Sequence, residues 1–157
     1  MAGGHYLGSA LNAVDAKSRV SVPTGYREIV AARSVDRELI VGKSNFDDCL
    51  IAYDPTYSAR LRAGIDAEFG PVNTRERAAA VRRAFGGTTG LKIDDAHRIT
   101  LTPGLRAAAG IDRLVFYVGA DEYFELWNPH TYLALPDADP DIAADLRREL
   151  AAKGEAA

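Results

Sequence analysis

The stretch VDAKSRVSVP (residues 14–23) joins a polar turn that carries Asp, Lys and Arg to alternating valines. Alternation of apolar and polar residues is typical of a β-strand with one buried face. An Asp at the start of a turn commonly accepts hydrogen bonds from nearby backbone N–H groups. Taken alone, the stretch therefore predicts a hairpin turn with an Asp15–Arg19 ion pair, which stabilises little if it is exposed.

A second version of this stretch lies 79 residues further along the chain. The aligned segments are VDAKSRVSVPTGYR (14–27) with IDDAHRITLTPGLR (93–106), RELIVG (37–42) with LVFYVG (114–119), and LIAYDPTY (50–57) with FELWNPHTY (124–132). The identical positions in the first pair are Asp15/Asp94, Arg19/Arg98, Gly25/Gly104 and Arg27/Arg106. An internal duplication of this kind predicts a pseudo-symmetric molecule.

Each copy predicts a ββαββ order of elements. Strands are expected at about 8–14, 38–42 and 48–53 in the first copy, at about 90–93, 113–118 and 122–127 in the second, and around Val20/Val22 and Ile99/Leu101 after the turns. In the second copy, Thr102 suits the N-cap of the short helix, Pro103 its first position and Gly110 its end. The fold class is therefore α+β.

Helices are predicted between and after the two copies. Asp54-Pro55 begins one over about 56–68, Asn73 caps a second over 73–85 with Glu76 as its capping-box partner, and a third covers about 139–152. The expected organisation is a first unit at 7–55, a helical connection at 56–90, a second unit at 91–134 and an acidic helical tail at 135–157.

Composition indicates a cytoplasmic protein with one domain, or with two small units that share one core. The chain has 157 residues, 47% of them hydrophobic, with no signal peptide pattern and no apolar run of the roughly 20 residues that a membrane span needs. We therefore expect no membrane partner. The single Cys49 fits a reducing compartment, and its position in a predicted strand favours a buried thiol.

The net charge of −3 is unevenly distributed. The tail from Pro136 holds six of the 22 acidic and three of the 19 basic residues, which leaves 16 of each in the rest of the chain. Such a neutral body can still present a cationic face, because binding follows the local potential.

Duplication changes the interpretation of the turns. Lys17, Arg19 and Arg98 would lie on exposed tips at equivalent edges of a pseudo-dimer, where cations with suitable donors can reach phosphates and guanine edges. Asp15 and Asp94 would shape the turns and orient the arginines without touching the nucleic acid. The sequence thus favours binding of double-stranded DNA.

The doubled D-x-x-x-R pattern, each followed by a β-alternating stretch and Pro, resembles the MraZ family of bacterial DNA-binding transcriptional regulators of the division and cell-wall genes. FELWNPHTY (124–132) supports the resemblance, which covers about residues 6–135. It implies two AbrB-like swapped-hairpin units of the double-split β-α-β type, assembly into rings, and binding to repeated promoter boxes in the nucleoid. It also implies that Lys17, Arg19 and Arg98 lie in the DNA-binding loops.

The chain departs from the family pattern at the residue before each motif arginine. That position is usually Gly in the family, but here it is Ser18 and His97, which adopt a left-handed turn only at some cost. The second turn lacks a lysine and carries the extra acid Asp95, so its cationic character depends on protonation of His97, which we also expect to contact the DNA. We therefore expect the first turn to bind phosphate more strongly than the second.

Other functions have weaker support. The histidines and Cys49 show no metal-ligand spacing, no nucleophile–base pair is visible, and no cofactor or small-molecule substrate is expected, so the chain is predicted not to be an enzyme. The basic stretch with Arg75, Arg77, Arg82 and Arg83 indicates a solvated face, a subunit contact or an auxiliary DNA contact. The main alternative is an AbrB-like antitoxin or a protein-interaction scaffold.

Overall fold

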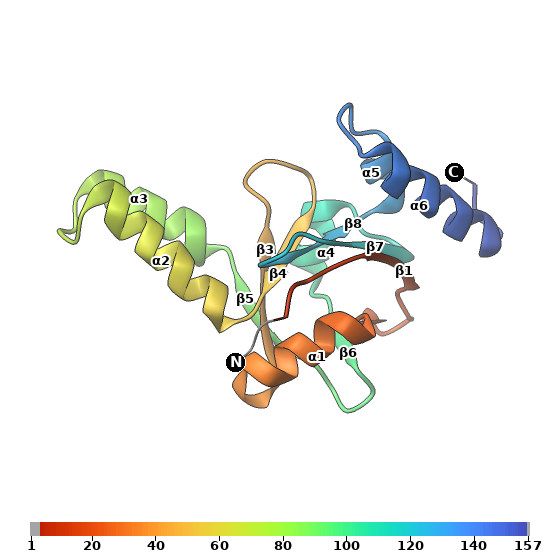
Figure 1. Cartoon of the computed structure of the whole chain (residues 1–157), viewed down its shortest axis with the longest axis horizontal. Helices are drawn as coiled ribbons and strands as arrows, with labels where there is room; N and C mark the ends of the chain where they lie inside the picture. The colour runs from red at the N-terminus through yellow and green to blue at the C-terminus, as the bar shows by residue number, and fades with distance from the viewer. Residues whose placement is uncertain (1–3, 157) are drawn as a thin grey trace.

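The computed structural model describes residues 4–156 and confirms the α+β class (Figure 1). The first half contains β1 (Ser9–Ala13), β2 (Arg19–Ser21), α1 (Thr24–Arg33), η1 (Val35–Arg37), β3 (Glu38–Lys43) and β4 (Leu50–Tyr53). The helices α2 (Pro55–Phe69), α3 (Arg75–Val81) and the π-helical turn η2 (Arg82–Gly86) follow. The second half contains β5 (Thr89–Lys92), β6 (Arg98–Thr100), α4 (Pro103–Ala109), β7 (Leu114–Gly119), β8 (Phe124–Trp127), α5 (Pro129–Leu133) and α6 (Pro140–Ala152).

The two halves are interleaved in one antiparallel sheet of order β1-β7-β8-β4-β3-β5. The edge strand β1 pairs with β7 of the second half, with Ser9 opposite Val118. Reciprocally, β5 pairs with β3 of the first half. The duplicate strands are β1 and β5, β3 and β7, and β4 and β8. Replacing each strand by its duplicate gives the same order read from the opposite edge of the sheet. The sheet therefore has the pseudo-two-fold symmetry that the duplication predicts.

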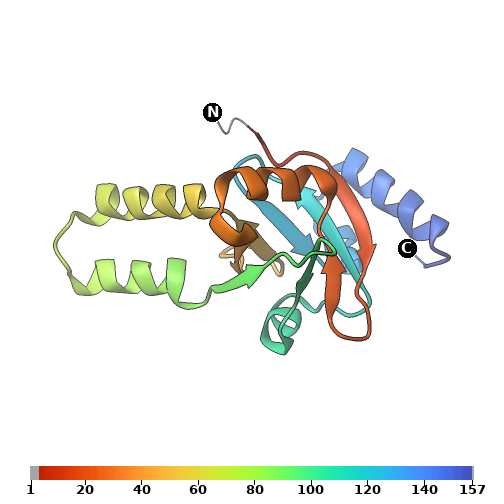
Figure 2. The same cartoon turned by 90° about the horizontal axis from the view of Figure 1, so that it is seen from below.

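A second, two-stranded sheet of β2 and β6 packs against one face of the large sheet with α1 and α4 (Figure 2). Apolar residues from both halves share this core, among them Val20, Ile99, Leu39 and Leu126. The buried Tyr117 hydroxyl donates to the Ser21 carbonyl across 2.9 Å and joins the two sheets. Both halves therefore contribute to a single core.

On the other face of the sheet, a second apolar cluster forms beneath α5 and α6. Leu146 and Leu150 of α6 are fully buried there, and Trp127 of β8 lies in the same cluster. Helix α5 was not predicted from the sequence. Helix α6 follows the predicted range closely, and its buried leucines attach the acidic C-terminal segment to the body.

The predicted helix ends hold at α4 and fail at α3. Thr102 Oγ1 accepts from the Leu105 amide at 3.2 Å, and Gly110 ends α4 with a left-handed φ of 60°. The N-cap of α3 is Thr74, whose Oγ1 accepts from the Arg77 amide at 3.2 Å. The prediction of Asn73 was therefore wrong by one residue.

Helices α2 and α3 form an antiparallel hairpin that projects from the sheet (Figure 1). Its base is fixed by Asp54, which is fully buried. The Asp54 carboxylate caps α2 by accepting from the Thr56 amide at 2.9 Å, accepts from the Tyr6 hydroxyl at 2.6 Å, and lies 3.4 Å from Arg33 Nη1. Three anchors thus set the direction in which α2 leaves the sheet.

Candidate nucleic-acid interface

The first turn is organised by one carboxylate. The Asp15 amide donates a hydrogen bond to the Arg19 carbonyl at 2.9 Å, and the Ser18 amide donates to the Asp15 carbonyl at 3.0 Å. Asp15 Oδ1 accepts from the amides of Lys17 and Arg19, both at 2.9 Å. Asp15 Oδ2 accepts from Arg19 Nε at 2.8 Å. The aspartate therefore fixes both the backbone of the turn and the direction of the arginine.

The second turn repeats this pattern. Asp94 Oδ1 accepts from the amides of Ala96 and Arg98 at 2.9 Å, and Asp94 Oδ2 accepts from Arg98 Nε at 3.2 Å. The His97 amide donates to the Asp94 carbonyl at 2.9 Å. Two sequence segments 79 residues apart thus build the same hydrogen-bonded device.

The residue before each motif arginine has a left-handed backbone, with φ of 62° at Ser18 and 66° at His97. A hairpin of this kind combines a type I turn with a following left-handed residue. Neither side chain favours this region, so the conformation is held by the hydrogen bonds of the neighbouring aspartate. Ser18 and His97, where the resemblance implied Gly, therefore adopt the left-handed conformation for which Gly is best suited.

Pairing of β2 with β6 brings the two turns side by side. Arg19 lies opposite Thr100, and Ser21 lies opposite Arg98. Arg98 Nη1 lies 3.9 Å from Asp15 Oδ2, so the second turn reaches the carboxylate of the first. The structure thereby joins both predicted motifs in one surface.

The cationic side chains of this surface differ in exposure and in ion pairing. Lys17 and His97 are exposed at the two tips, whereas the side chains of Arg19 and Arg98 are each 30% exposed. Within the described chain, Arg19 is tied to a carboxylate through Nε, which leaves its two terminal nitrogens for other acceptors. Planar donors of this type match phosphates and guanine edges.

Both aspartates are charged at neutral pH. The backbone N–H of Arg19, its guanidinium and the Lys17 amide lower the pKa of Asp15 below its ordinary value. The Arg98 and Ala96 amides and the Arg98 guanidinium do the same for the pKa of Asp94. Hydrogen bonds and positive charge that favour the ionised form have this effect.

Three arginines of this surface were not singled out from the sequence. Arg106 Nη1 donates to Ser18 Oγ at 2.8 Å, and Arg37 Nη2 donates to Asp95 Oδ1 at 2.9 Å. Arg27, the duplicate of Arg106, lines a shallow hollow with Arg37 and His97. Arg27 and Arg106 are identical in the two copies, and this identity could have indicated that both lie near the turns. No pattern in the sequence indicated the contact between Arg37 and Asp95.

Other titratable groups lie away from the turns. Cys49 is fully buried, as predicted, and burial raises the pKa of its thiol to about 12. Among residues 4–156, no three His, Cys, Asp or Glu side chains are placed to share a metal ion. No helix in that range is long and apolar enough to cross a bilayer.

These features define a class of protein: a duplicated α+β fold with exchanged strands that presents two adjacent Asp–Arg turns. A family model described as "MraZ protein, putative antitoxin-like" matches residues 84–151. Relatives named "Transcriptional regulator MraZ" include one from Saccharophagus degradans, 32% identical over 92% of this chain and 96% of the relative. Others from Burkholderia ambifaria and Burkholderia multivorans are 34% identical over 85% of this chain and 89% of each relative. The chain belongs to the MraZ family.

Proposed function

We propose that the chain is a DNA-binding transcriptional regulator that reads duplex DNA with its paired turns. The observation that carries this proposal is the placement of the two Asp–Arg turns side by side, with Arg98 Nη1 3.9 Å from Asp15 Oδ2. A single turn would be an ordinary hairpin. Two turns joined through β2 and β6 present Lys17, Arg19, His97 and Arg98 on one surface.

In this mechanism the aspartates position the arginines and the arginines contact the DNA. In Arg19, a carboxylate that holds Nε restricts the guanidinium without occupying its terminal nitrogens. In Arg98, Nε is held by Asp94 and Nη1 also lies 3.9 Å from Asp15 Oδ2, which leaves Nη2 for the DNA. Preorganisation of this kind lowers the entropic cost of ordering a long side chain on binding. The carboxylates themselves do not touch the nucleic acid in this mechanism, because phosphates repel them.

Specificity and affinity are proposed to come from assembly. A ring-like homo-oligomer would offer several pairs of turns to repeated promoter boxes, and effective concentration would then multiply weak single contacts. This explains how a chain with a net charge of −3 can bind DNA. We propose residues 7–55 and 91–134 as the two units, linked by 56–90 and followed by the tail at 135–157, in a non-enzymatic protein of the cytoplasm and nucleoid.

Replacement of the motif arginines tests the proposal. Arg19→Ala should weaken binding to the DNA upstream of the chain's own gene by about tenfold or more, because a well-placed arginine contributes roughly 1–3 kcal/mol. The slope of log affinity against log salt should fall by about 0.9 for each phosphate that the variant no longer neutralises. Mobility-shift titrations across a salt series measure both quantities.

Arg98→Ala should have the same effect to a smaller degree, because the second turn contains the extra acid Asp95, which pairs with Arg37. Arg147→Ala, which removes an exposed arginine of α6, is the matched control and should leave affinity unchanged. Unaltered affinity in both motif variants would remove the turns as the binding site. Retained binding to a protein partner without DNA affinity would favour the antitoxin or scaffold function.

A further inference from the structure

We infer that the helical hairpin of one copy (residues 55–86) docks against the acidic C-terminal segment (residues 136–156) of a second copy, in a head-to-tail contact. This inference rests on the self-association proposed above and assigns the surfaces that produce it. It also gives a role to the basic stretch with Arg75, Arg77, Arg82 and Arg83.

The two surfaces carry opposite charge. The hairpin holds six arginines and three acids, whereas the chain from Pro136 to its end holds six acids and three bases. Arg60 pairs with Glu122, and Arg77 pairs with Asp66. The side chains of the remaining hairpin arginines form no hydrogen bond or ion pair within residues 4–156: Arg62, Arg75, Arg82 and Arg83. Four cations on the hairpin are therefore available to an acidic partner.

The acidic segment has carboxylates to match. Asp141 lies exposed in the first turn of α6, and Asp137 lies exposed just before that helix. Neither forms an ion pair with a side chain of the described residues. Asp139 is engaged as the N-cap of α6, and Asp145 pairs with Arg148. Asp137 and Asp141 are thus the acids best placed to receive arginines from another copy.

The hairpin also lacks the burial that would stabilise it alone. No residue of α2, α3 or η2 is buried, and Val72 at the tip is 71% exposed. Short helices gain most of their stability from packing an apolar face, which this hairpin achieves only in part. A partner that covers its sides would supply the missing contacts.

A pocket at the base of the hairpin points to the same surface. Its volume is about 190 Å³, and it is lined by apolar groups of Ile51, Tyr53 and Leu61 with Arg83 among them. The Tyr53 hydroxyl is buried and has no hydrogen-bond partner among the described residues. A docked chain could supply the missing acceptor beside a cationic group.

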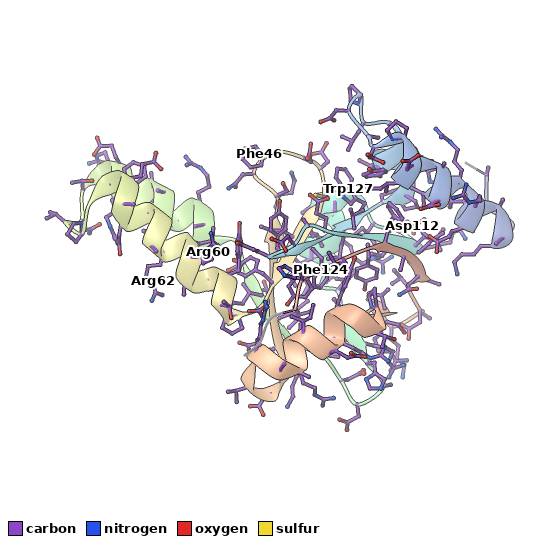
Figure 3. All side chains as sticks on the ribbon, in the orientation of Figure 1. Phe46, Arg60, Arg62, Asp112, Phe124 and Trp127 are labelled. Atoms are coloured by element: carbon purple, nitrogen blue, oxygen red, sulfur yellow. The ribbon has the colours of Figure 1, made fainter. Side chains whose placement is uncertain are left out.

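The two surfaces lie at opposite ends of the molecule, as Figures 1 and 2 show. Figure 3 places Arg60 and Arg62 on the projecting α2, far from the end that carries α6. The lengths agree, since α2 has 15 residues and α6 has 13, which is about 22 Å and 20 Å at 1.5 Å per residue. A contact between different patches of identical chains repeats from copy to copy and closes into a ring when the rotation allows it.

Charge reversal on each surface tests the contact. The triple variant Arg75→Glu, Arg82→Glu and Arg83→Glu should disperse the assembly towards the monomer mass of 16.9 kDa in light scattering. The double variant Asp137→Lys and Asp141→Lys should do the same, with Asp139 left in place because it caps α6. Mixing the two variants should restore the assembly. When the two variants alternate, the acidic hairpin of one meets the basic tail of the other, and the unchanged basic hairpin meets the unchanged acidic tail.

The control is Arg147→Glu, which adds an acid to α6 and should not weaken assembly. Wild-type assembly in both charge-reversed variants would overturn the inference, as would failure of the mixture to recover when each variant alone keeps its native circular dichroism. Loss of DNA binding with intact assembly in the hairpin variant would make these arginines a DNA contact instead. Because assembly is measured without DNA, the paired turns are tested separately by the arginine-to-alanine variants.

Discussion

At the scale of single residues, the chemistry of the turns depends on Asp15 and Asp94. Each carboxylate accepts two backbone amides and one arginine Nε, so a single side chain sets the turn and aims the cation. Lengthening the side chain to Glu would misplace both oxygens. The doubled D-x-x-x-R pattern is therefore a geometric requirement of the two turns.

The charge of Asp15 makes the first turn sensitive to acid. Its pKa is lowered from an ordinary 3.8, so its contribution to the turn is complete above that value and is lost as the pH falls through the lowered pKa. In NMR spectra followed from neutral pH to about 2, the Lys17 and Arg19 amide signals should shift together with a midpoint below 3.8.

Asp15→Asn is the control for this titration. It keeps one oxygen acceptor and removes the ionisation, so the acid-dependent shift at Lys17 and Arg19 should disappear. A midpoint at or above 3.8 in the unmodified chain would show that the hydrogen bonds to Asp15 do not favour its charged form.

Much at this scale could be predicted from the sequence. The role of Asp15 and Asp94 as hydrogen-bond acceptors follows from local turn chemistry. The left-handed backbone at Ser18 and His97 was expected from the family resemblance, which implied Gly at these two positions. The Arg37–Asp95 contact could not be predicted, because it joins residues 58 apart whose meeting depends on tertiary structure. That contact partly offsets the extra acid of the second turn.

At the scale of elements, the segments that follow the duplicate strands β4 and β8 form different helices. Asp54 caps α2 and is tied to Tyr6 and Arg33, whereas Asn128 caps α5 and its amide donates to the Gly110 carbonyl at 2.7 Å. Helix α5 has five residues and α2 has fifteen. The same strand-to-helix exit thus leads to a packed helix in one copy and to a projecting hairpin in the other.

Removal of the buried Asp54 carboxylate should destabilise the fold. Asp54→Ala deletes the cap, the Tyr6 hydrogen bond and the Arg33 ion pair, and removal of one partner of a buried charged pair costs about 3 kcal/mol or more. Asp54→Asn copies the residue of the duplicate and should cost about 1 kcal/mol less than Asp54→Ala, because it loses the same ion pair with Arg33 but retains an oxygen for the cap.

Urea unfolding of both variants measures this difference. Equal losses of stability in the two variants would mean that the charge of Asp54 carries the whole effect and that the cap contributes nothing. Unchanged stability in Asp54→Ala would contradict the anchoring of α2 described above.

Element boundaries were predicted best where a local signal marks them. The Pro and Gly residues around α4 placed it well, and Asp54-Pro55 placed the start of α2. Two adjacent capping residues, Asn73 and Thr74, left the start of α3 ambiguous by one position. Neither η2 nor α5 has a distinctive periodic pattern, because each spans only five residues.

At the scale of the whole molecule, exchange of strands makes each half depend on the other. The pairing of β1 with β7 and of β5 with β3 leaves neither half with its own complete sheet. The duplication predicted pseudo-symmetry, but periodicity along a strand does not specify its partner. The exchange of strands was predicted from the resemblance to swapped-hairpin proteins, and the pairing of β1 with β7 and of β5 with β3 confirms it.

Separated halves should therefore fail to fold as monomers. Residues 1–86 and 87–157, expressed apart, should lack the near-ultraviolet circular dichroism of packed aromatic residues, and mixing them should restore it. The reason is that Tyr26 of one half and Tyr117 and Phe124 of the other pack in the same core. A folded monomer from either half alone would show that the interleaving is dispensable.

The pairing of Ser9 with Val118 also has a consequence for protein synthesis. A nascent chain grows at about 5–20 residues per second, so the partner of β1 leaves the ribosome many seconds after β1 itself. During that interval one edge of a β-strand is available to other chains, including nascent copies on the same messenger. The exchange of strands that joins the two halves thus makes early translation the period in which this protein most needs protection by chaperones.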